Sequence, residues 1–167
     1  AMVAPTPVSA LLHAVAVVKA GVFTILTTVV YVFGIDFLSA SGATTWLVWL
    51  ASFTILSSSF VAITKDDIKS RLAYSTISQL SYIVLGAAIA SSVAVQGAAV
   101  HIVMHAAGKI TLFFCAGAIY VQAHLTKISE VDGQGREMTW IFAAFFLGAL
   151  SIIGIPPAGG SLSLIHI

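Results

Sequence analysis

The stretch AAVHIVMHAAGKITLFFCAGAIYV, residues 98–121, decides how the rest of the chain is interpreted. Its run of about 24 residues is mostly apolar and long enough to cross roughly 30 Å of hydrocarbon as an α-helix. His101, His105 and Lys109 recur at every fourth position, so a helix places them in one polar stripe. Lys109 falls near the middle of the run. A cation at that depth costs roughly 2.5–3.5 kcal/mol on insertion scales, so Lys109 is expected to face protein or water rather than lipid.

Composition places the whole chain in a membrane. Of its 167 residues, 59% are hydrophobic and 8% are charged, whereas a soluble domain carries about 25% charged residues. The sequence therefore predicts an all-α fold, a polytopic bundle of transmembrane helices. The formal net charge of +1 and the absence of a basic patch indicate no nucleic-acid partner. The single Cys115 excludes a disulfide framework.

About five spans are expected from the apolar runs, at residues 8–33, 44–64, 68–90, 98–121 and 138–155. Pro156 and Pro157 are expected to end the last span sharply. A proline break inside a membrane leaves backbone carbonyls that protein or water must satisfy, and such interrupted helices occur in many transport pathways. A plain helix end at the membrane surface is the alternative.

The third span is unusually polar in its first half. Hydroxyl and amide side chains need hydrogen-bond partners in lipid, so this part is expected to face other helices or internal water. Close helix packing is an equally good role for its small residues. The polar side chains in question are Tyr74, Ser75, Thr76, Ser78, Gln79, Ser81 and Tyr82.

The loops predict the orientation of the bundle. If the first span starts on side A, loops 65–71 and 124–137 also lie on side A, and loops 34–43 and 91–97 lie on side B. No Lys or Arg occurs in the side B loops. The positive-inside rule therefore makes side A cytoplasmic. The side A loops hold Lys65, Lys69, Arg71, Lys127 and Arg136.

Two lysines inside apolar runs, Lys19 and Lys109, carry the functional prediction. A lysine removed from water can load and release a proton near neutral pH, although its ordinary pKa is near 10.4. Imidazoles can both donate and accept, so His13, His101 and His105 are candidate relay stations between the lysines. None of the six acidic residues lies inside an apolar run, so a carboxylate partner is expected from outside this segment.

The same histidines have a second interpretation. His101 and His105 have the spacing of a metal-binding pair on a helix. Two imidazoles with no further ligand are weak support for zinc or haem, so no metal and no cofactor is predicted. A metal- or haem-binding membrane protein remains the alternative from a different class, and satisfied structural histidines are a third possibility.

Five segments of the chain, in this order, resemble the antiporter-like membrane subunits shared by Mrp-type cation/proton antiporters and respiratory complex I. They cover most of the chain from residue 4 to residue 160. The matching segments are APTPVSALLH at 4–13, VKAGV at 18–22, DIKSRLAYSTISQ at 67–79, HIVMHAAGKITLFFCAG at 101–117 and GIPP at 154–157.

The resemblance implies a family core of about fourteen membrane helices with two inverted five-helix repeats. Residues 1–160 then correspond to the eighth helix through the first half of the broken twelfth, most of the second repeat. Residues 161–167 do not match the family pattern and are expected to be a foreign end. Lys109, His101 and His105 match the family's central lysine and its neighbouring histidines, and Lys19 with His13 falls on the helix that bridges the repeats.

The resemblance also implies a function. The expected protein is a proton-translocating subunit of a multisubunit monovalent cation/proton antiporter, with Lys19 favouring the D-type Mrp subunits. A proton-pumping membrane subunit of a complex I-type NADH:quinone oxidoreductase is the alternative, with no redox site in this chain. Either assignment implies other membrane subunits, protons and the lipid bilayer as partners, a monovalent cation in the antiporter case, and a multi-pass location in a bacterial cell (inner) membrane.

Overall fold

The computed structural model describes residues 6–12, 16–156, 160–161 and 165. Over these residues the chain is helical throughout, and its β-type pairing is one isolated bridge between Asp67 and Lys127. The predicted all-α class is therefore confirmed. The elements, in chain order, are α1 Thr6–Ala10, α2 Val17–Thr27, the π-helical turn η2 Thr28–Phe33, α3 Ile35–Ser41, α4 Thr45–Thr64, α5 Ile68–Ala88, α6 Ser92–Ala123, the 3₁₀ turns η3 Ile128–Glu130 and η4 Gln134–Arg136, and α7 Thr139–Ile153.

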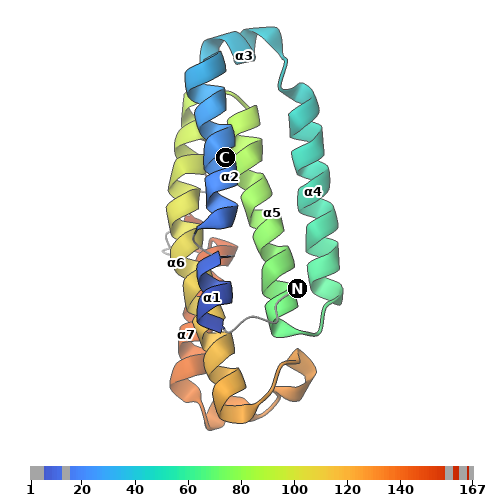
Figure 1. The fold of residues 1–167 in the computed structure, drawn as a ribbon, viewed down its shortest axis with the longest axis vertical. Helices are drawn as coiled ribbons and strands as arrows, with labels where there is room; N and C mark the ends of the chain where they lie inside the picture. Colours follow the sequence, from blue (N-terminus) through green and yellow to red (C-terminus); the bar gives the residue numbers. More distant parts are fainter. Residues whose placement is uncertain (1–5, 13–15, 157–159, 162–164, 166–167) are drawn as a thin grey trace.

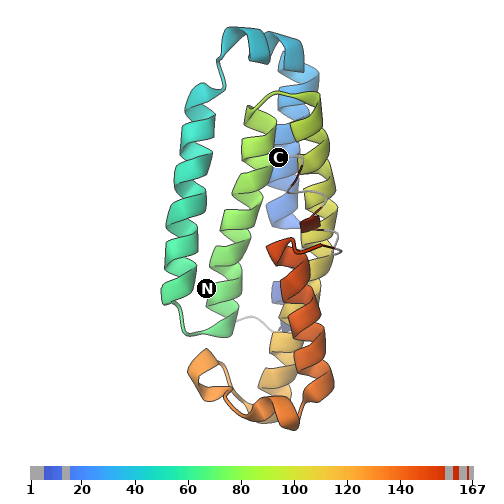
Figure 2. The same cartoon turned by 180° about the vertical axis from the view of Figure 1, so that it is seen from behind.

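The helices form an elongated bundle in which α5 lies between α4 and α6 (Figure 1). Seen from behind, α7 runs along the lower half of α6, while α2 lies beside its upper half (Figure 2). Within the described residues, α4 and α6 are long and apolar enough to cross a membrane. The segment Val17–Phe33 together with α3 passes the same test as a bent pair, which raises the number of candidate spans to three.

The first predicted span, residues 8–33, is not one continuous helix. α1 ends at Ala10, and α2 begins at Val17. The Ala16 amide donates to the Leu11 carbonyl at 3.0 Å, an i→i−5 bond of the π type. An unbroken run of apolar residues therefore predicted the path of the chain but not this interruption. His13 lies outside the described residues.

The predicted polar break at residues 34–43 contains a short helix, α3. Gly34 has φ +80°, a left-handed backbone value that side chains other than glycine rarely adopt, and it allows α3 to turn 86° away from the preceding helix. α3 therefore crosses the end of the bundle that faces side B, and it appears at the top of Figure 1.

The other helices follow the sequence closely. α4 and α5 occupy the second and third predicted spans, and Asp67 caps α5 by accepting the Ser70 amide at 2.7 Å. α6 extends beyond the predicted 98–121 to 32 residues, about 48 Å at 1.5 Å per residue. α7 ends at Ile153, ahead of the Pro156 turn, and Pro157 lies outside the described residues.

The two loops assigned to side A meet at one end of the bundle. The Ile68 amide donates to the Thr126 carbonyl at 3.0 Å, and the Ile128 amide donates to the Asp66 carbonyl at 2.8 Å. These bonds join the start of α5 to the connection between α6 and α7. The basic loops therefore share one end of the molecule, at the bottom of Figure 1, as the orientation prediction requires.

α6 and α7 approach each other closely beside the central lysine. A Cβ placed on Gly108 would lie 2.9 Å from Cγ1 of Ile152 on α7. Only a residue without a side chain fits this contact unless α7 shifts. Gly108 therefore allows α7 to cover one side of α6 at the level of Lys109.

Candidate functional site

Lys109 lies completely buried between α5 and α6. Its side chain is 0% exposed. The ammonium group donates to the Leu72 carbonyl at 3.1 Å and to Ser75 Oγ at 3.0 Å. The Leu72 carbonyl also accepts from Thr76 Oγ1 at 2.7 Å. The amine thus points into the protein, toward neutral oxygen acceptors on α5.

His101 and His105 continue the stripe along α6. Both imidazoles are buried, and their ring centroids lie 5.9 Å apart with nearly parallel planes, 22° between them. The Tyr82 ring of α5 lies 6.4 Å from the His101 ring at a tilt of 59°. His101 is also hydrogen-bonded to the backbone of Gln79. The α6 stripe therefore faces a polar stripe on α5 along two turns of both helices.

Lys19 approaches the same stripe from α2. Its side chain is buried, and its charge acts on both His101 and His105. His105 also feels the charge of Lys109. Four of the five predicted site residues, Lys19, His101, His105 and Lys109, are thereby gathered into one buried group, while the fifth, His13, lies outside the described residues.

The surroundings of this group contain few ionisable partners. The acidic residues of the chain occur in loops or in the short helical turns. An ion pair in the described part, Lys127 with Glu130 at 3.6 Å, belongs to the side A loop. No group of three or more metal-ligating side chains occurs among the described residues, so within this part the His101 and His105 pair gains no third ligand.

Two partners of Lys109 could not be named from the sequence. The polar start of the third span indicated that some hydroxyl would meet another helix, but not that Ser75 would be that hydroxyl. The Leu72 carbonyl carries no sequence signal, because any helical residue has one. The useful signal is the spacing of Leu72, Ser75 and Gln79, which share one face of α5.

The side A loops hold the start of α5 in place. Asp66 accepts hydrogen bonds from Ser129, at 2.7 Å from its hydroxyl and 3.1 Å from its amide. The bond from the Ser129 hydroxyl, followed by that from its amide, lowers the pKa of the exposed Asp66 carboxyl below its ordinary value. Asp66 and the Asp67 cap together fix the first turns of α5, which carry Leu72 and Ser75.

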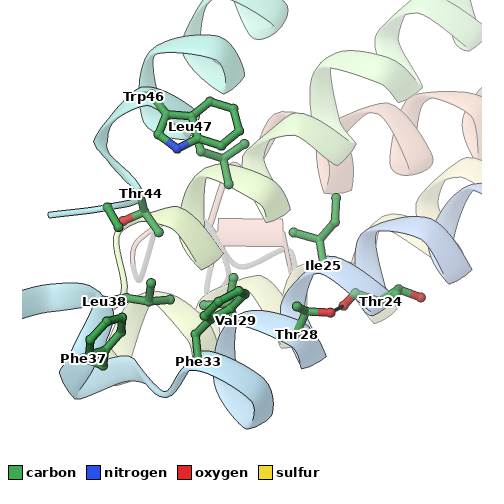
Figure 3. Close-up of a pocket in the computed structure, with 11 residues that line it drawn as sticks. Thr24, Ile25, Thr28, Val29, Phe33, Phe37, Leu38, Thr44, Trp46 and Leu47 are labelled. Atoms are coloured by element: carbon green, nitrogen blue, oxygen red, sulfur yellow. Dashed lines mark hydrogen bonds between the residues drawn. The ribbon is translucent and has the colours of Figure 1, made fainter. Parts of the chain in front are cut away.

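The cavities of the molecule lie away from this buried group. A cavity of about 370 Å³ opens between α2, α3 and α4 near side B, and Figure 3 shows its lining. Thr24, Thr28 and Thr44 supply hydroxyls, and Trp46 and Phe37 supply rings. No lysine or histidine lines it. A second cavity of about 310 Å³ touches Leu72 and Arg71 at side A and is otherwise apolar.

The fold and the buried stripe define a class, a helical membrane protein with an internal line of titratable side chains. Residues 1–167 match the family described as NADH:quinone oxidoreductase/Mrp antiporter, TM. The chain belongs to this family, as the resemblance of its five segments predicted.

Several relatives show the breadth of the family. NADH-quinone oxidoreductase subunit N of Desulforudis audaxviator is 39% identical over 115 residues, which cover 69% of this chain and 23% of that protein. One of the Na(+)/H(+) antiporter subunits of Bacillus subtilis is 35% identical over 98% of this chain and 21% of its own length. The chain thus spans less than a quarter of the length of either relative.

Solved structures share the fold as well. A chain of the Mrp complex from Dietzia sp. DQ12-45-1b superposes with a TM-score of 0.81 at 32% identity, covering 97% of this chain and 17% of that one. A chain of the membrane-bound sulfane sulfur reductase, an archaeal respiratory membrane complex, gives a TM-score of 0.86 at 25% identity over 98% of this chain and 33% of that one. The described helices therefore correspond to part of a larger membrane protein in both.

Proposed function

We propose that this chain is part of a proton-translocating membrane subunit of a multisubunit monovalent cation/proton antiporter. The observation that carries the proposal is the environment of Lys109. Its ammonium group is removed from lipid and solvent and is held by two neutral oxygens, on Leu72 and Ser75. An ammonium in such a place can give up its proton without breaking an ion pair within this group, so Lys109 is the central proton site.

The histidines and the second lysine extend this site into a path. His105 and His101 stack along α6 from Lys109, and Lys19 on α2 lies within electrostatic reach of both imidazoles. A proton arriving on one member of the group raises the cost of charging its neighbours, which favours onward transfer. Lys19, His101, His105 and His13 are accordingly proposed as relay residues.

Complex I-type NADH:quinone oxidoreductase is the second candidate assembly. Relatives from that class, such as subunit N of Desulforudis audaxviator at 39% identity, favour it as strongly as the antiporter relatives favour the first. The likeness to a chain of the Mrp complex, at 32% identity over 97% of this chain, keeps the antiporter first. Purification of the complete parent complex separates the two, because only the second carries redox subunits.

The relatives also support the proposed partners and location. Each named relative is one of several subunits by its name, so other membrane subunits and the lipid bilayer are the proposed partners, with protons and a monovalent cation as substrates. We place the chain in a bacterial cell (inner) membrane, with the basic end of the bundle in the cytoplasm. Residues 1–160 are proposed to be the antiporter-like part, and residues 161–167 a tail outside it.

The test is proton flux in vesicles containing the full-length parent protein. Lys109→Ala is expected to abolish coupled transport while the protein still assembles, because the central proton site is gone. Lys127→Ala is the matched control, since this lysine lies exposed in the side A loop, paired with Glu130. Flux in Lys109→Ala equal to that of the control would count against the proposal.

The metal-binding alternative has its own test. Stoichiometric zinc or haem in the purified parent protein, lost when His101→Ala and His105→Ala are combined, would replace the transport proposal. We expect no such metal, since the pair has no third ligand among the residues that the structure describes.

A further inference from the structure

Two side chains in the buried group have polar atoms with no hydrogen-bond partner among the described residues. They are Gln79 Oε1 on α5 and both ring nitrogens of His105 on α6. The His105 side chain is only 3% exposed. Buried polar atoms almost always have a partner, and leaving one unpaired costs about 1–3 kcal/mol. Two such groups on facing helices therefore point to a shared polar occupant.

The geometry brings these two side chains to the same level. The Gln79 backbone is hydrogen-bonded to His101, and Ser75, one turn earlier on α5, binds Lys109. His105 lies between His101 and Lys109 on α6, which runs antiparallel to α5. Helical side chains lean toward the N-terminus of their own helix. The Gln79 amide therefore extends from the His101 level toward the His105 level.

We infer that Gln79 is a positioning residue of the proton path, and that it holds one water molecule together with His105. This inference rests on the proposed function, because it concerns the step between Lys109 and His105. The water donates one hydrogen bond to Gln79 Oε1 and bonds to a ring nitrogen of His105. A water molecule suits the site because it both donates and accepts, and buried waters typically make about three hydrogen bonds.

The proposed role follows from what an amide cannot do. Lys109, His101 and Lys19 are the titratable groups around His105, and each changes charge when it binds or loses a proton. Gln79 does not titrate, so its oxygen accepts in the same way in every charge state of these neighbours. In a transfer step the water receives a proton on one side and releases one of its own on the other, so it ends neutral. Gln79 orients the water and exchanges no proton.

The test uses the full-length parent protein in vesicles, with Gln79→Leu and Gln79→Glu. Gln79→Leu keeps the approximate volume but loses the acceptor, and proton flux is expected to fall roughly tenfold or more with normal assembly. Gln79→Glu keeps an acceptor oxygen, so it is expected to retain more flux than Gln79→Leu. It should also change the pH profile, because a new titratable group enters the path. A purely structural role would not predict this pH change.

The matched control is Gln122→Leu, which removes an exposed glutamine from the same helix that carries His105. Infrared difference spectra in H₂¹⁸O provide a readout that does not depend on transport. An isotope-sensitive water band is expected in the unchanged protein and in Gln122→Leu, and is expected to be lost in Gln79→Leu. Retention of that band together with unchanged flux in Gln79→Leu would overturn the inference. If the unchanged protein has the band but carries no protons, the proposed function fails while the water site stands.

Discussion

α4 and α5 are neighbours of nearly equal length, 20 and 21 residues, but they solve the problem of a membrane in opposite ways. α4 packs chiefly on α5 and leaves a broad apolar face exposed, with Phe53 at 70%. α5 is too polar to qualify as a span by its hydropathy, yet it lies between α4 and α6. The difference teaches that α5 tolerates its hydroxyls because both of its neighbours satisfy them.

Particular contacts support this comparison. Ser78 of α5 is hydrogen-bonded to Ser59 of α4 at 2.9 Å, while Ser75 faces the other way and accepts from Lys109 at 3.0 Å. α4 places its own hydroxyls mainly on its backbone, as Thr54 does toward Leu50 at 2.8 Å. α4 thus provides an outer wall, and α5 provides the acceptors of the buried group.

The largest expected effect comes from a charge on the outer wall. Phe53→Lys places a cation on the exposed apolar face of α4 and is expected to cost about 2.5–3.5 kcal/mol of insertion free energy near the helix centre. Phe53→Leu is the control. The fraction of parent protein recovered in the membrane measures the effect. Equal recovery of both variants would mean that this face meets water or a polar partner instead of an apolar environment.

A smaller effect is expected from the inner helix. Ser75→Ala removes one of the two acceptors of the Lys109 ammonium, and a hydrogen bond to a charged group contributes about 1.5–3 kcal/mol. We expect reduced thermal stability in detergent and slower proton flux. Ser81→Ala is the control, since this hydroxyl donates to the Ile77 carbonyl of its own helix. If Ser75→Ala matches Ser81→Ala in both measurements, Ser75 is not a needed partner of Lys109.

The contact between the two helices themselves should contribute less. A double-mutant cycle with Ser59→Ala and Ser78→Ala is expected to give a coupling energy of about 0.5–1.5 kcal/mol in thermal unfolding, as for a neutral hydrogen bond. A coupling energy near zero would show that α4 and α5 are held by apolar packing alone.

The smallest effect is expected at the side A loops. Because the pKa of Asp66 is lowered in the folded protein, its bonds to Ser129 stabilise the fold above the unfolded pKa of the carboxyl. That contribution is lost as pH falls through the folded pKa. Asp66→Asn should therefore flatten the acid side of the stability profile slightly. A profile identical to that of the unchanged protein would contradict this role.

The sequence predicted most of the helices and the stripe on α6, because both depend on regular spacing along one segment. It could not predict which part of α5 would meet Lys109, since spacing within a helix does not specify its neighbour. The interruption after α1 and the helix α3 were also missed. In both places the residues are apolar, and the chain direction depends on local backbone geometry, such as the φ of +80° at Gly34.

The link between Asp66 and Ser129 was missed for a related reason. The sequence named Asp66 or Asp67 as the cap of α5, and Asp67 takes that role. The partner of Asp66 is 63 residues away, in a loop that has no regular pattern. Long-range contacts between loops depend on how the helices pack, so only the structure could reveal them.

The most direct measurement is proton flux in vesicles carrying the full-length parent protein with Lys109→Arg. Arginine keeps a buried cation that can donate to Leu72 and Ser75, but it does not release its proton in proteins. We expect an assembled protein with strongly impaired flux, because Lys109 acts by exchanging a proton and not only by carrying charge. Flux equal to that of the unchanged protein would contradict that role.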